Sequence, residues 1–139
     1  MGSSALSSLY AQRSTVLAGI ANSKNQIAIL EEKIRRLQEA SGKLSTSISE
    51  LETTKSSIDG LTIDESRWKG EKEDKFENYY DAYKSSVKSF ISKTEDAKQT
   101  MEEDIARYES KKAAYETGLA NLQNTLASID SQISAAQKE

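Results

Sequence analysis

The sequence of 139 residues contains no cysteine, no histidine and no proline. Without cysteine the chain forms no disulfides and offers no thiolate metal ligands, and without histidine it lacks the commonest general base. A chain without cysteine fits a cytosolic protein, and it also fits a secreted protein that does not rely on disulfides. Composition therefore leaves the compartment open.

Apolar and aromatic residues are scarce, at 36% and 6% of the chain, whereas charged residues reach 29%. A compact core of normal thickness needs more apolar material than this, but a long helix needs only one apolar stripe. The chain also has no run of about 18 apolar residues. We therefore expect elongated helices, with neither a membrane span nor a Sec-type signal peptide.

Charges of the two signs are interleaved along the chain. Its 19 basic and 22 acidic residues give a net charge of −3, and they form no basic patch. Clustered Lys and Arg supply most of the affinity of proteins for nucleic acid, so nucleic acid is not an expected partner.

A heptad repeat occupies the first half of the chain, with positions a and d starting at Leu6 and Leu9 and ending at Ile58. Twelve of these sixteen positions are aliphatic. The exceptions are Arg13, Ser23, Ser41 and Lys55. A 3-4 repeat of this length predicts a long helix with a coiled-coil seam and a left-handed supercoil.

The second half carries its own apolar stripe. Its predicted members are Phe76, Tyr80, Tyr83, Val87, Phe90, Thr94, Ala97, Met101, Ile105, Tyr108, Lys112, Tyr115, Leu119, Leu122, Leu126, Ile129, Ile133 and Ala136. Steps of three and four alternate except around Met101, where two fours occur in succession. This pattern predicts a second long helix with a stutter, which locally unwinds a supercoil.

The segment between the two stripes predicts a turn. Asp59-Gly60 resembles a helix C-terminus, and residues 62–65 have the spacing of a capping box at a new helix start. We expect one all-α domain over residues 1–139, a long antiparallel two-helix hairpin with helix 1 at about 4–58, the turn at 59–70 and helix 2 at about 71–137. If the hairpin closes near residue 65, facing residues have numbers that total about 130. Ile48 then lies near Tyr83, Ile34 near Ala97, and Leu9 near Leu122.

Several apolar residues fall outside the two main stripes. They are Tyr10, Leu17, Ile29, Tyr79 and Ile91. A two-helix hairpin buries only the faces that its helices turn to each other, so it is expected to associate with a further helix. These five residues are the candidate interface with a partner, which is either a second copy in a homodimer or a partner hairpin.

The sequence predicts no enzyme, no catalytic residue, no cofactor and no metal site. Its carboxylates lie among Lys and Arg on polar faces, and a narrow seam offers no water-poor pocket in which a carboxyl pKa is shifted for catalysis. Glu102, Glu103 and Asp104 fall on different faces of a helix, so they do not form the oxygen shell that Mg²⁺ or Ca²⁺ requires.

One short motif stands in the predicted turn. Trp68 and Gly70, followed by Phe76, resemble the turn of the WXG family of helical hairpins exported by type VII secretion systems. The usual pattern has Ala where this chain has Lys72. The structural alternative is that Trp68 fills the gap where two helices diverge and that Gly70 is a permissive backbone position at a helix entry.

Longer segments resemble the YwqH-like family over nearly the whole chain. They include "ILEEKIRRLQEASGKLSTSISELETTKSSI", "WKGEKEDKFENYYDAYKSSVKSFISKTEDA" and "MEEDIARYESKKAAYE". The resemblance implies an accessory protein of Gram-positive bacteria that binds the helical N-terminal domain of an LXG toxin and acts as its chaperone for type VII export. A second small helical accessory protein is a further implied partner. The alternative is a self-associating coiled-coil scaffold or spacer.

An export signal of the form Tyr-x-x-x-Asp/Glu is missing. The fourth residue after Tyr108 is Lys112, and the fourth after Tyr115 is Leu119. Three explanations remain open: the partner supplies the signal, a composite signal forms in the complex, or this protein stays in the cytoplasm as a chaperone.

Overall fold

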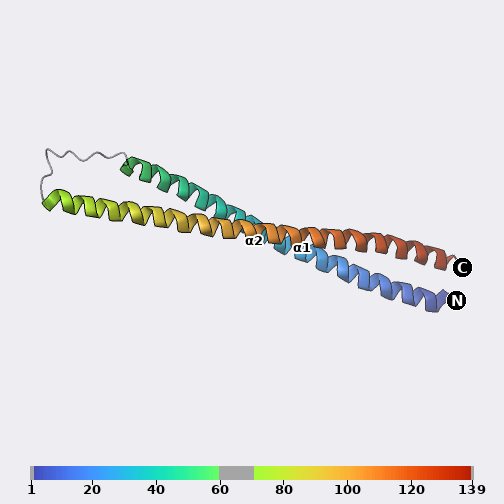
Figure 1. Ribbon diagram of the computed structural model, residues 1–139. Helices are drawn as coiled ribbons and strands as arrows, with labels where there is room; N and C mark the ends of the chain where they lie inside the picture. The colour runs from blue at the N-terminus through green and yellow to red at the C-terminus, as the bar shows by residue number, and fades with distance from the viewer. Residues whose placement is uncertain (1, 60–70, 139) are drawn as a thin grey trace. The chain divides into compact units, whose positions relative to one another are not determined.

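The computed structural model describes residues 2–59 and 71–138, which form two α-helices (Figure 1). Helix α1 is Gly2–Asp59 and helix α2 is Glu71–Gln137. The described residues contain no strand. The predicted fold class, an all-α helical hairpin, is confirmed. Neither described helix contains a stretch that is both long and apolar enough to cross a membrane.

The chain divides into two compact units, each built from both helices. The terminal unit contains Met1–Arg36 and Ile105–Glu139, and the middle unit contains Leu37–Asp104.

The seam of α1 follows the heptads. In both units, every a or d position from Leu6 to Lys55 is buried or half-buried, including the polar ones. The cause is geometric, because a repeat of 3.5 residues keeps one side of a helix turned toward its neighbour. The hydroxyls of Ser23 and Ser41 are small enough to fit there, and no buried side-chain oxygen or nitrogen among the described residues lacks a hydrogen-bond partner.

In the terminal unit the two helices run antiparallel, and cross-helix ion pairs define their register. Arg13 Nε lies 2.8 Å from Asp130 Oδ1, and Lys112 Nζ lies 3.4 Å from Glu31 Oε1. The numbers 13 and 130 total 143, as do 31 and 112. The predicted total of about 130 is therefore wrong.

The individual pairs of that prediction are wrong as well. In the terminal unit Leu122 lies beside Gly19, where an added Cβ atom would be 3.2 Å from its Cδ1, so it is not the neighbour of Leu9. Lys33 Nζ is 5.4 Å from the centroid of the Tyr108 ring, which places the adjacent Ile34 far along α2 from Ala97.

The middle unit has its own core, formed by Ile48, Val87 and Ile91 with Leu51 packed against them. Ile48 therefore faces Val87 and Ile91, while the predicted neighbour Tyr83 is half exposed. One groove is lined by Ser45, Ile48 and Ser49 of α1 together with residues of α2. The α2 residues are Glu95, Lys98, Gln99 and Glu102.

The seam of α2 in the middle unit differs from the predicted stripe. Val87, Ile91 and Thr94 are buried, and Lys98 and Met101 are half-buried, with alternating steps of four and three. Phe90 and Ala97, which the prediction placed on the stripe, are exposed. The predicted stutter is wrong because it came from choosing Phe90 over Ile91. With Ile91 in the seam, the spacing from Val87 to Met101 is unbroken.

The start of α2 extends past the end of α1. Figure 1 shows the green end of α1 stopping short of the start of α2. Among the described residues, the first turns of α2 from Glu71 therefore have no part of α1 beside them. We call this end of α2 the overhang.

Candidate protein-binding surface

The turn motif lies largely outside the described residues. This applies to Trp68 and Gly70. Phe76 belongs to α2, but its side chain also lies outside the described part of the structure. The role of the motif stays a prediction from the resemblance.

Three of the five candidate interface residues lie on α1 in the terminal unit. Tyr10, Leu17 and Ile29 are 48%, 38% and 40% exposed. The Tyr10 hydroxyl accepts a hydrogen bond of 2.9 Å from Gln137 Nε2 of α2, so its ring is held at the edge of the seam. Large apolar side chains in such positions offer contact area to a further helix. Their role in binding a partner stays a prediction.

The other two candidates, Tyr79 and Ile91, have opposite environments. Tyr79 is 77% exposed on α2, whereas Ile91 is only 8% exposed and belongs to the core with Ile48 and Val87. Ile91 is thus not available to a partner in this fold. The physical reason is its heptad position, because it lies four residues after Val87 on the side of α2 that faces α1.

Phe90 takes the place that Ile91 was expected to have. Phe90 is 56% exposed, and Tyr83, seven residues earlier, is 50% exposed. With Tyr79 one turn before Tyr83, these rings follow one side of α2 at spacings of four and seven. We call Tyr79, Tyr83 and Phe90 the aromatic stripe. An unbroken heptad through Ile91 is the sequence signal that would have found it.

Small residues surround the C-terminal end of this stripe. Ser85, Ser86 and Ser89, with Phe90 and Lys93, line a shallow hollow on α2. Serine side chains beside an exposed ring leave room for a neighbouring helix to approach closely, and a ring of that helix can fill the hollow. The stripe and the hollow together form a surface suited to helix packing.

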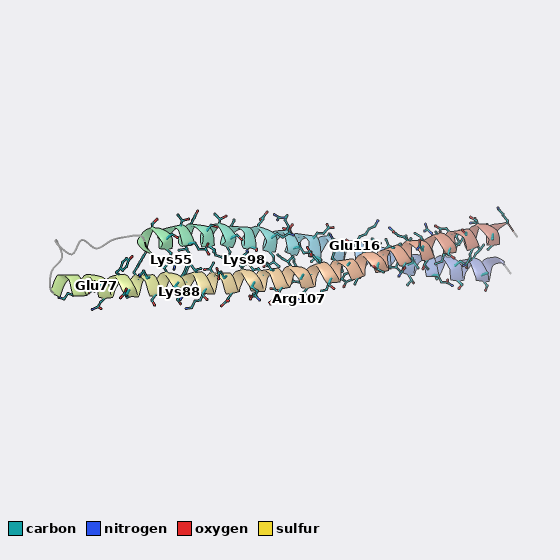
Figure 2. The ribbon with its side chains drawn as sticks, turned by 45° about the horizontal axis from the view of Figure 1, so that its top comes forward. Lys55, Glu77, Lys88, Lys98, Arg107 and Glu116 are labelled. Atoms are coloured by element: carbon teal, nitrogen blue, oxygen red, sulfur yellow. The ribbon has the colours of Figure 1, made fainter. Side chains whose placement is uncertain are left out.

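Cations occupy seam positions in both units. In the middle unit Lys55 and Lys98 lie between α1 and α2 (Figure 2), and both are half-buried. In the terminal unit the pKa of Lys112 is raised: partial burial acts to lower it, but the hydrogen bond with Glu31 and the negative charges of Glu116 and Glu31 outweigh that effect.

The strongest local charge cluster lies on α1. Glu32 accepts hydrogen bonds from Arg35 Nη2 at 2.6 Å and from Arg36 Nε at 3.0 Å. These two bonds lower the pKa of Glu32 from 4.5 to about 2. Glu32 is half-buried and the two arginines are exposed, and together they form a local ion cluster that stabilises α1.

The exposed surface of the described helices offers features that suit packing against another helix. The hollows described above are open, and no three acidic side chains among the described residues come together in a way that could hold a metal ion. What the surface offers is exposed rings and aliphatic side chains beside small residues, which are the usual anchors and holes of helix packing.

A family model described as YwqH-like matches residues 11–131. The chain belongs to the YwqH-like family. This match covers almost all of both helices, so the family resemblance seen in the heptads and in the segment after Trp68 is confirmed. No curated protein and no solved structure matches this YwqH-like chain.

Proposed function

We propose that this chain is an accessory protein that binds the helical LXG domain of a cognate polymorphic toxin and supports its export by a type VII secretion system. Membership of the YwqH-like family supports this proposal, through the role that the sequence resemblance implies for the family. In the same proposal the protein is not an enzyme, uses no cofactor, and meets its toxin in the cytoplasm before any joint export. A second small helical accessory protein completes the assembly.

The observation that carries the proposal is the large apolar surface that the hairpin leaves exposed. Tyr10, Leu17 and Ile29 on α1 and Tyr79 on α2 project outside the seams of their units. A helical domain that packs against such side chains removes them from water, which contributes about 25 cal/mol per Å² of apolar area. Helix packing against an LXG domain would therefore use the same physics as the seams themselves.

Co-expression with the LXG toxin encoded beside this chain tests the proposal. We expect a stable complex that elutes as one species in size-exclusion chromatography. Leu17→Ser should weaken the complex, and Ala18→Ser is the matched control, because Ala18 is also exposed on α1 but points to another side of the helix. Absence of a complex between the two wild-type proteins contradicts the proposal.

A self-associating scaffold or spacer is the alternative function. It predicts a tight homodimer that shows no affinity for any LXG domain. Light scattering on the isolated chain, together with the co-expression experiment, separates the two functions.

A further inference from the structure

The aromatic stripe combines features that the proposed function does not explain. Its three rings lie in the middle unit, where the overhang has no part of α1 beside it. The three rings occupy heptad positions next to the seam. Together with Ser86 they follow alternating steps of four and three, as a second potential seam on α2 would. Another copy of the chain presents the same rings, small residues and charges, so it is a candidate to cover this second seam.

We infer that the aromatic stripe pairs with the stripe of a second copy, with the two α2 helices antiparallel. Antiparallel seams form layers in which paired residue numbers have a constant total. If Tyr79 pairs with Phe90 of the second copy, Tyr83 falls opposite Ser86 of the second copy, and the two-fold symmetry repeats both layers.

The hollow gives this register a physical basis. Ser86 lies in the hollow that Ser85, Ser89, Phe90 and Lys93 also line. In the proposed register the Tyr83 ring of one copy enters this hollow of the other copy. The two central layers each place a ring against a serine, and the two outer layers each place a ring against a ring.

Charge complementarity favours the same register. Along the outer edge of the paired stripes, the register brings Lys75 to Asp96 of the second copy and Ala82 to Ser89 of the second copy. Symmetry gives two such ion pairs, one at each end, with small residues between them where the helices approach most closely. Shifting the second copy by one heptad, so that Tyr79 meets Tyr83, moves Lys75 to Ser89 and loses both ion pairs.

The size of the surface predicts a weak dimer. An aromatic side chain has about 150–250 Å² of surface, so the exposed parts of the three rings amount to roughly 350 Å² per copy. Both copies together contribute about 700 Å², which is less than the roughly 1,200 Å² typical of stable interfaces. A dimer of this kind exchanges readily. This inference does not depend on toxin binding.

Sedimentation velocity of the chain alone tests the inference, over a concentration series up to about 1 mM. We expect the sedimentation coefficient of the wild type to rise from monomer to dimer. Phe90→Ser should weaken the dimer at least about tenfold without loss of helix content, because Phe90 is outside the core. Tyr10→Ser in the terminal unit is the matched control and should leave the dimer unchanged.

A charge exchange makes the register itself testable. Lys75→Asp and Asp96→Lys should each weaken the dimer several-fold, because each brings like charges together, and the double variant should restore it. Glu109→Lys changes charge outside the stripe and should have no such effect. A wild type that stays monomeric throughout the series, or a double variant that is no better than the single ones, overturns the inference. If the wild type is monomeric and Phe90→Ser abolishes its complex with the toxin, the inference is also overturned, because the stripe then binds the toxin.

Discussion

Neighbouring residues Phe90 and Ile91 should respond oppositely to truncation, although the ring of Phe90 is the larger apolar group. Ile91 is buried against Ile48 and Val87, whereas Phe90 is 56% exposed. Truncating a buried isoleucine to alanine costs about 2–5 kcal/mol, and the lower part of that range applies to a seam covered by a single neighbouring helix. We therefore expect Ile91→Ala to lower the free energy of unfolding by about 2–3 kcal/mol. Phe90→Ala should change it by less than about 0.5 kcal/mol.

Thermal unfolding followed by circular dichroism measures this difference. For a chain of this length 1 kcal/mol corresponds to roughly 3–4 °C, so Ile91→Ala should lower the Tm by about 6–12 °C. Phe90→Ala should keep the Tm within about 2 °C of the wild type. The measurements should be made at low protein concentration, where the weak dimer does not contribute. Equal losses in the two variants would refute the seam through Ile91 and restore the stripe through Phe90.

Three further groups of variants test the helices and their ion pairs. Gly42→Ala and Gly118→Ala should each raise stability by about 1 kcal/mol, because a Cβ atom meets nothing within 4 Å at either position and alanine favours helix. Gly19→Ala should gain less stability, because its Cβ atom would lie 3.2 Å from Leu122 Cδ1. Asp130→Arg should lower stability by about 1 kcal/mol, because it places two arginines opposite each other. Adding Arg13→Asp to that variant should recover most of the loss. Denaturant titration of the single and the double variant measures both effects. The folded-state pKa of Glu32 is lowered from 4.5 to about 2, so its contribution to stability is present above pH 4.5 and is lost as the pH falls toward 2. Glu32→Gln should remove that part of the pH dependence of stability. A stability profile identical to that of the wild type contradicts this prediction.

The long-range pattern of the fold could be predicted from the sequence because it depends on local periodicity. Apolar residues at alternating steps of three and four identify two helices and the side that each turns inward, and the residues between 59 and 71 separate them. The exposure of the large apolar side chains was harder to predict. Tyr10, Leu17, Ile29 and Tyr79 are exposed as expected, but the choice between Phe90 and Ile91 depended on one step in the repeat. Size and hydrophobicity favoured Phe90, while the phase set by Met101 and later residues requires Ile91.

The register of the hairpin could not come from apolar periodicity at all, since sliding one helix by seven residues restores the same apolar pattern. Only the polar members of the seams distinguish the alternatives. In the observed register of the terminal unit Lys112 meets Glu31. A slip of one heptad in one direction would bring Lys112 to Lys24, and a slip in the other direction would bring it to Gln38. Both slips lose the attraction between Lys112 and Glu31, and the first also places two positive charges together. Placing the centre of the turn at residue 65 ignored these charges and gave a register displaced along α2 by roughly three and a half turns. The cations that interrupt the apolar seams are thus the part of the sequence that specifies which layers form.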